Sequence, residues 1–508
     1  MATKPTSASK QPKPVTGAHV RMYRLGTGDC FVIKFLAGKT ATYTLMIDCG
    51  AWTGSKSRFK KHVEDLKAHV DNRVDALVVT HEHKDHVLGF ELCEDLFTEG
   101  FEVGETWLSW AEEDGDPAVE KLKKEYGAKK KALAAASDIL SKAVHDPTTQ
   151  SNYQGMHMGL QLLEAQQRFA AAVESFRDLH GIPGSQLAAA GGNYGGDLEG
   201  MKVVKQKISS NRIRHFKPGD IIEEVPGLEG VRIYVLGPPR SLEAIKAEDS
   251  GEPGETYDPN KELANSAAFA AAASAFGRAS GDQRPFDRSF EAGIDATHAY
   301  EKTKNFWRRI DQDWLMSAGS LALRLNSGIN NLSLALAIEF VASGRVMLFP
   351  GDAEYGSWAS WHQINWKQPG TVKNKDGSPK HLTEDLLNRT VFYKVAHHLS
   401  HNGTARRLGL AMMTHKDLAA MATLDYEVIS DGWKGTMPNQ DILTELLEQT
   451  KGRLMVMNPK GLFFDARKTI PLKTRIGKSR RLMSPAEKKA FDTAHEESEL
   501  WIDFKVKG

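Results

Sequence analysis

Residues 80–90 read THEHKDHVLGF and follow directly on the apolar run VDALVV. This run predicts a buried strand, so the polar cluster is expected at the exit of that strand. Imidazole and carboxylate groups are the usual ligands of zinc and similar divalent ions, and three histidines within six residues are uncommon on an ordinary surface loop. In extended backbone His81 and His83 project to the same side and can hold one ion. After the chain turns, Asp85 and His86 can face a second ion.

A later stretch, FPGDAEYGSW near residue 350, places another carboxylate at the end of an apolar run. The run Arg345–Phe349 predicts a strand, and Asp352 follows it at a Gly-Asp turn. Taken alone, such a pair is more often an ordinary turn. Beside the histidine cluster, Asp352 is a candidate to bridge two ions.

The stretch KVAHHLSHNG near residue 400 supplies further imidazoles behind the predicted strand Thr390–Val395. Only one of His397 and His398 needs to bind metal, and the other can contact substrate. We assign His397 as the ligand and His398 as the catalytic residue, and the sequence leaves this choice open. His401 is expected at the rim of the site.

Asp48 ends an apolar run and suits a supporting role. A carboxylate that accepts the second N–H of a ligand histidine fixes the tautomer of the ring and raises its basicity. The alternative reading, an ordinary turn aspartate before Gly50, carries similar weight without the other residues.

Composition places few limits on function. The chain has 508 residues, of which 41% are hydrophobic, enough for a large core. Lys plus Arg number 66 and Asp plus Glu 65, so net charge neither favours nor excludes a polyanionic partner. Three cysteines without a CxxC pair fit a reducing compartment. The polar N-terminus has no apolar signal segment and no long apolar run occurs, so we expect a cytoplasmic protein without membrane contact.

Strands alternating with helices predict an α/β sheet protein. Among the later elements, the pattern predicts a strand at Glu427–Ser430 and a helix at Asn439–Thr450. The expected organisation comprises a disordered tail (1–17), a main domain (18–111 and 200–465), a helical insertion (112–199), a second insertion within the domain (240–315) and a basic C-terminal extension (466–508).

With these residues assembled, the chain resembles metallo-β-lactamase-fold hydrolases, whose HxHxDH signature is matched by His81, His83, Asp85 and His86. Within that fold it is most similar to the DNA-processing ComEC-type metallohydrolase domain. The segments that carry this similarity are RLGTGDCFVIKF (24–35), NNLSLAL (330–336), LFPGDAE (348–354), KVAHHLSHN (394–402) and VISDGWKGTMPNQDIL (428–443). The resemblance implies an αβ/βα four-layer sandwich with helical insertions and a metal site at the sheet edges.

The resemblance also implies hydrolysis by a metal-bound hydroxide, oriented by Asp85 and Asp352, with His398 stabilising the attacked group. Zinc, as one or two ions, is the expected cofactor, and manganese is a competitor. Where many members of this fold have a third histidine, this chain has Asn330 and Asn331, which become possible third-ligand or substrate positions. Lys394 is a possible source of positive charge toward substrate.

The leading functional hypothesis is therefore a phosphodiesterase, most directly a nuclease. The basic stretch 468–481 is compatible with a phosphate backbone and equally with a solvated face. A small phosphodiester is the alternative substrate, and an acyl (lactone or lactam) hydrolase is a weaker option. A third class of hypothesis is a partner-dependent component with a mainly structural metal, which would dock a protein through the helical insertion.

Overall fold

The computed structural model describes residues 13–145, 167, 171, 173–182, 197–209, 212–247, 325–371, 373–374, 376–429, 437–460, 462–465 and 468–508. Most of the N-terminal tail and of the second insertion, and much of the helical insertion, lie outside these residues. The predicted domain bounds therefore stay predictions.

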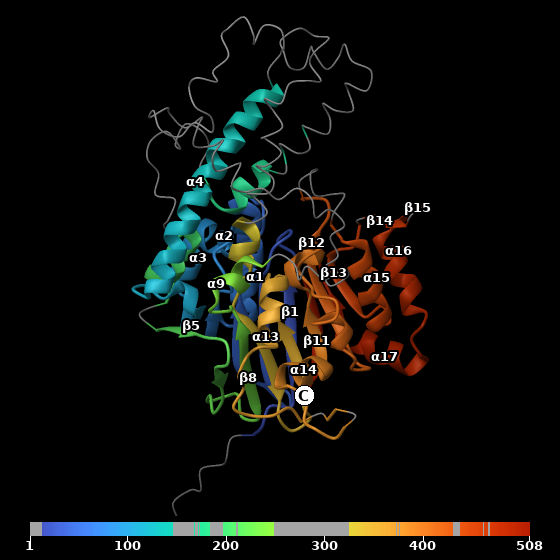
Figure 1. The fold of residues 1–508 in the computed structure, drawn as a ribbon. Helices are drawn as coiled ribbons and strands as arrows, with labels where there is room; N and C mark the ends of the chain where they lie inside the picture. The colour runs from blue at the N-terminus through green and yellow to red at the C-terminus, as the bar shows by residue number, and fades with distance from the viewer. Residues whose placement is uncertain are drawn as a thin grey trace, which may run out of the picture.

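The first large sheet contains both ends of the described chain (Figure 1). Its order is β16-β17-β1-β2-β3-β4-β5-β6, in which β3, β4, β5 and β6 run parallel. Its strands are β1 (Gly17–Tyr23), β2 (Phe31–Ala37), β3 (Thr40–Ile47), β4 (Arg73–Val78), β5 (Glu102–Ser109), β6 (Ile213–Phe216), β16 (His495–Glu497) and β17 (Trp501–Lys507).

The second large sheet has the order β13-β12-β11-β10-β9-β8-β7, with β10 to β13 parallel. Its strands are β7 (Ile221–Ile222), β8 (Val231–Gly237), β9 (Ala335–Phe340), β10 (Arg345–Phe349), β11 (Thr390–Lys394), β12 (Ala419–Asp425) and β13 (Leu454–Asn458). A separate hairpin joins β14 (Leu462–Asp465) to β15 (Lys468–Pro471).

Three hydrophobic clusters define the layers. One fills the space between the sheets, where Val20 and Phe31 of the first meet Ile338 and Phe349 of the second. The outer face of the first sheet is covered by α1 (Lys56–His69), α2 (Lys84–Leu92), α3 (Glu94–Thr98), α8 (Glu199–Val203) and η2 (Val204–Ile208). The outer face of the second is covered by α13 (Tyr355–Trp361), α14 (Leu382–Asn388), α15 (Gln440–Gln449) and α16 (Leu472–Arg480). The order helix, sheet, sheet, helix is the four-layer sandwich that the sequence predicted.

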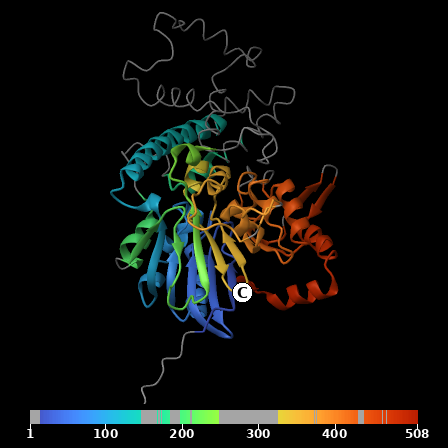
Figure 2. The same cartoon turned by 60° about the horizontal axis from the view of Figure 1, so that its bottom comes forward.

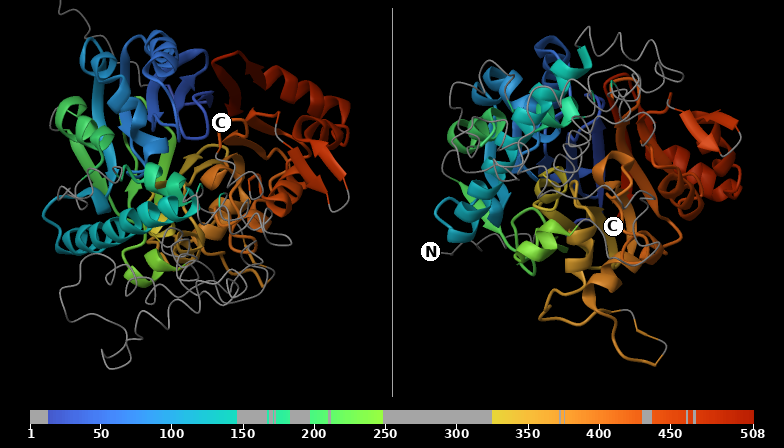
Figure 3. Two further views of the ribbon diagram at one scale, coloured as in Figure 1. Left: turned by 90° about the horizontal axis from the view of Figure 1, so that it is seen from above. Right: turned by 45° about the horizontal axis from the view of Figure 1, so that its top comes forward.

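Helices at the periphery lie on opposite sides of the sandwich. Figures 1 and 2 show α4 (Pro117–His145), from the predicted helical insertion, on one side and α17 (Pro485–Ala494) on the other. The view from above in Figure 3 shows the same separation. The remaining short elements are η1 (Trp110–Glu112), α9 (Leu242–Lys246), η7 (Ala396–Leu399) and η8 (Leu410–Met412).

One predicted strand was wrong. Residues 426–429 form turns, and the strand of this region is β12, which ends at Asp425. Its sequence, AAMATLD, is rich in alanine, which has little intrinsic preference for strands. All seven residues are buried, so small side chains suit a central strand packed on both faces.

No helix in the described part of the chain is both long enough and apolar enough to cross a bilayer.

Candidate metal centre

Parallel strands gather the candidate residues because their carboxyl ends share one edge of a sheet. His81–His86 follow β4, Asp352 follows β10, and His397 and His398 follow β11. The first group leaves the first sheet and the other two leave the second. The two edges face each other across the sandwich. Residues more than 300 positions apart in the sequence, such as His81 and His398, therefore lie near one another.

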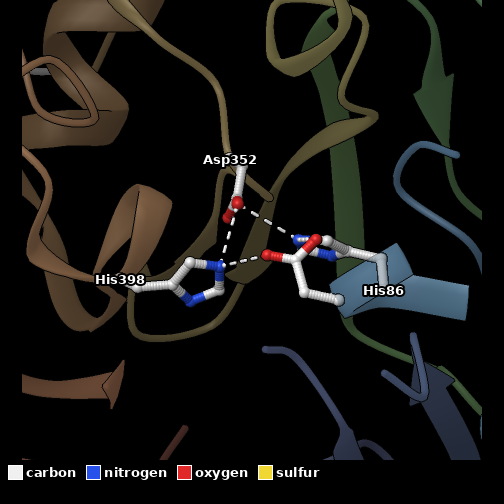
Figure 4. Close-up of side chains that lie close together, drawn as sticks. His86, Asp352 and His398 are labelled. Carbon is white, nitrogen blue, oxygen red and sulfur yellow. Dashed lines mark hydrogen bonds and ion pairs between the residues drawn. The ribbon is translucent and has the colours of Figure 1, made fainter. Parts of the chain in front are cut away.

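Four side chains converge closely at this point. Asp85, His86, Asp352 and His398 each offer one ligand atom, and these atoms lie within 4.8 Å of one another. His398 Nε2 lies 3.0 Å from Oδ2 of both Asp85 and Asp352. His86 Nε2 lies 3.1 Å from Asp352 Oδ2. Figure 4 draws this contact as a dashed line. All four are buried, with no more than 1% of each residue exposed.

His81 and His83 form a second, adjoining pair of imidazoles. His81 Nε2 is 3.0 Å from His83 Nδ1, and the ring centroids of His81 and His86 are 4.1 Å apart. The other nitrogen of His81 lies within hydrogen-bond distance of Ser333 Oγ, which also accepts the backbone N–H of Asp352. One hydroxyl therefore connects the histidine loop to the strand end that carries the aspartate.

Asp48 fixes the orientation of His86. Its Oδ2 lies 2.8 Å from His86 Nδ1 and also accepts the hydroxyl of Thr80, whose backbone N–H donates to Oδ1. With its Nδ1–H donated to Asp48, His86 presents Nε2 to the cluster. Asp48 has a positive φ of 55°, which turns the chain sharply at the end of β3.

Lys394 lies among the carboxylates instead of pointing to solvent. Its ammonium donates to Asp352 Oδ1 at 3.0 Å and lies 2.5 Å from Oδ2 of Asp29. Asp29 also accepts the hydroxyl of Thr423. Because its charge is shared by two buried acids, Lys394 balances the charge of the site. The residue itself is buried, with 1% of its surface exposed.

The structure separates the two neighbouring histidines. His397, His398 and Leu399 all have positive φ (47°, 50° and 67°), a conformation that costs energy in non-glycine residues. This turn directs His398 toward Asp85 and Asp352. The ring of His397 instead contacts Glu354, with Nδ1 3.3 Å from Oε1, and Asn402. The imidazole among the acids is thus His398, where we had assigned His397 as the ligand.

The other predicted positions differ in their surroundings. Asn330 donates to Glu354 and lies 3.3 Å from His397 Nε2, so it borders the site. Asn331 instead accepts the backbone N–H groups of Glu354 and Ser357, which holds the start of α13. His401 lines a small cavity with His397.

The electrostatics divide the histidines into two classes. Burial opposes protonation of His398, but Asp352 and Asp85 raise its pKa to about 9. Burial likewise opposes protonation of His86, whereas Asp352 and the other acids raise its pKa well above the usual value. Burial lowers the pKa of His81 and His83 far below normal, with a further contribution from His86. These two rings are therefore neutral and can donate lone pairs.

Burial also opposes ionisation of Asp352, yet His398, Lys394 and His86 hold its pKa well below the usual value. The pKa of Asp48 is raised, because burial outweighs its contact with His86.

The donor set fits divalent metal. Asp85 Oδ1 is buried without a hydrogen-bond partner among the described residues, and His86 Nε2 has only its ion-pair contacts with the carboxylates of Asp352 and Asp85 there. Orphaned ligand atoms of this kind are expected where an ion would engage them. The nitrogen and oxygen donors match the preferences of zinc, and manganese accepts the same oxygens.

Close backbone approach makes two glycines necessary here. A Cβ built on Gly50 would lie 2.2 Å from the carbonyl carbon of Asp85. Gly351 has a φ of +60°, and a Cβ there would lie 2.9 Å from Ser333 Cβ. Any side chain at either position would push the histidine loop or Asp352 out of place.

Sequence reasoning missed four residues of the site, which are Asp29, Trp52, His180 and Glu354. Asp29 stands in a Gly-Asp pair like that of Asp352, which was the available signal. Trp52 donates its indole N–H to Asp85 Oδ2 at 2.8 Å. His180 packs against His83 with ring centroids 4.6 Å apart. Neither of these two contacts has a local sequence signal.

Comparison with known families agrees with this geometry. The family model of the metallo-beta-lactamase superfamily matches residues 23–151. The two mixed sheets with their helices are consistent with the metallo-β-lactamase fold, which confirms the predicted fold class.

Comparisons with curated proteins and with solved structures gave no significant match. The closer similarity to ComEC-type domains stays a prediction. The superfamily match suggests a metal-dependent hydrolase, and the buried His/Asp cluster is a possible metal site.

Proposed function

We propose that the chain is a metal-dependent phosphodiesterase, with nucleic acid as the leading substrate class. The observation that carries the proposal is the buried convergence of Asp85, His86, Asp352 and His398, with His81 and His83 beside them. Two adjoining ligand groups suit a pair of ions about 3.5–4 Å apart, an arrangement typical of in-line phosphoryl displacement.

His81, His83, Asp85, His86, Asp352 and His398 would hold the metal. When bound, divalent ions would lower the pKa of a coordinated water toward about 7 and offset negative charge on the attacked group. The chain's own task is to keep these ligands in place. Asp48 holds the tautomer of His86, and Ser333 couples His81 to the backbone of Asp352.

Burial of the site favours a second candidate, a small phosphodiester. The cavity beside His397 measures about 20 Å³ and is lined in part by Trp52, Phe176 and Met437. Since a single water needs roughly 10–15 Å³, this space admits little more than one water. A nucleic-acid chain would require the wall to move, whereas a compact diester would require less.

The test is hydrolysis by purified protein supplemented with Zn²⁺ or Mn²⁺. The substrates are single-stranded DNA, double-stranded DNA, RNA and bis-p-nitrophenyl phosphate. We expect turnover that His86→Ala abolishes and that His215→Ala, in edge strand β6, retains. Cleavage of a polymer supports the nuclease, and turnover of the diester alone supports the small-substrate form. Bound metal without turnover of any substrate would reject the proposal.

A further inference from the structure

His83 has one nitrogen in the site and one outside it. Its Nδ1 lies 3.0 Å from His81 Nε2, so both atoms face the same point. A neutral imidazole carries its proton on only one nitrogen, and a lone pair on Nδ1 therefore places the proton on Nε2. Nε2 is buried and has no hydrogen-bond partner within the described chain. An unsatisfied buried donor is unfavourable, so a partner for this N–H is expected.

The ring of His180 packs against the ring of His83. The two ring centroids are 4.6 Å apart at an interplanar angle of 67°, and only 1% of His180 is exposed. Neither nitrogen of His180 has a hydrogen-bond partner in the described residues. Two unpartnered imidazoles thus lie edge to face in the interior, and each can supply what the other lacks.

The segment that carries His180 is fastened against the site. Asp178 forms an ion pair with Lys84 of the histidine loop at 2.8 Å. Glu174 accepts the hydroxyl of Ser137 in α4 at 2.5 Å. Phe176, from the same segment, lines the cavity beside His397. These contacts fix residues 173–182 beside the histidine loop, α4 and the cavity that His397 borders.

His83 and His180 are not hydrogen-bonded to each other in this structure. We infer that His180 is a positioning residue, and that a rotation of either ring lets it accept the Nε2–H of His83 and thereby fix the tautomer that offers Nδ1 to metal. The inference rests on the proposed metal-binding function. It also gives residues 173–182 a role. The metal ligands follow the parallel strands, whereas this segment supports one of them, His83, from outside those strand ends. Such outer contacts typically contribute about 10–100-fold to metal affinity.

Three substitutions separate hydrogen bonding from packing. His180→Phe keeps a planar ring but has no acceptor, His180→Gln keeps an acceptor on a flexible chain, and His180→Ala removes both. Zinc affinity is measured by competition with a chromophoric chelator, and kcat and KM are measured beside it. We expect affinity to fall about 10–100-fold in His180→Phe and His180→Ala, and to recover substantially in His180→Gln. His215→Phe is the matched control and should match wild type.

Wild-type affinity in His180→Phe, or no recovery in His180→Gln, would overturn the inference. A second measurement needs no variant. In ¹⁵N-histidine-labelled wild type, the Nε2–H of His83 should be visible by NMR and protected from solvent exchange. Its absence would also overturn the inference. If wild type binds neither zinc nor manganese, the proposed function itself fails. If wild type binds zinc and His180→Phe binds it equally well, only the inference fails.

Discussion

His397 and His398 are neighbours in the chain, yet their rings lie in regions of opposite character. His398 is surrounded by the carboxylates of Asp85 and Asp352, which raise its pKa to about 9. His397 faces the region of Glu354, Asn330 and Asn402, and burial, only partly offset by Asp352, lowers its pKa to about 4. The left-handed turn at these two residues creates the difference. Two neighbouring histidines can therefore have different roles where the backbone turns between them.

The sharpest test of this comparison is a pair of alanine variants. Loss of a metal ligand removes several kcal/mol of stabilisation, so His398→Ala should lower kcat/KM for the diester roughly 1000-fold and reduce bound metal. His397→Ala removes no atom from the four-residue group and should cost about tenfold. Kinetics and elemental mass spectrometry measure both effects. Equal losses would show that the two regions act as one.

The carboxylate region should also depend strongly on the buried ammonium of Lys394. Lys394→Met leaves Asp29 and Asp352 without their shared cation, and breaking a buried pair costs about 3–5 kcal/mol. Urea unfolding of metal-free protein measures the change in unfolding free energy. Lys473→Met, at an exposed position in α16, should stay within about 0.5 kcal/mol of wild type. A small effect of Lys394→Met would mean that Lys394 does not balance the charge of these two carboxylates.

The two histidines should respond to pH in opposite directions in metal-free protein. The folded pKa of His398, about 9, exceeds the unfolded value of about 6.5. Its stabilisation is therefore complete below pH 6.5 and is lost as the pH rises through 9. The folded pKa of His397, about 4, lies below the unfolded value, so its contribution is lost as the pH falls from 6.5 through 4.

Denaturant midpoints across pH 3.5–9.5 check this expectation. His398→Gln should flatten the alkaline part of the curve and His397→Gln the acidic part. The reverse pattern would contradict the assignment of the two regions.

The smallest expected effect concerns the indole that borders the carboxylates. Trp52→Phe removes the N–H that donates to Asp85 Oδ2 and should weaken metal binding about tenfold. Chelator competition measures the change. Trp366→Phe is the control, because that indole donates to Thr383 away from the cluster. An unchanged metal affinity in Trp52→Phe would show that the indole N–H of Trp52 does not support metal binding.

The sequence was most informative where ligands are close together in the chain. His81, His83, Asp85 and His86 occupy one short loop after one strand, so their proximity follows from local geometry. The four-layer order was also predictable. Strands that alternate with helices, in a chain with enough hydrophobic residues for a large core, can pack in only a few layer architectures.

Residues that meet through the tertiary fold were not predictable in the same way. Asp29 and Lys394 are paired although they are separated by 365 positions, and nothing in either local sequence indicates the other. The choice between His397 and His398 depends on φ angles that no side-chain pattern reveals. His180 lies in a stretch whose apolar spacing indicates only helical packing.

The pairing of β17 with β1 has a consequence for how the protein is made. Gly17 lies opposite Lys507, and Asp503 binds the guanidinium of Arg21 at 2.8 Å. During synthesis β1 therefore leaves the ribosome long before β17 is made. One edge of β1 stays unpaired until nearly 500 further residues have been added. An open edge recruits other strands, so nascent or C-terminally truncated chains should be substrates for chaperones.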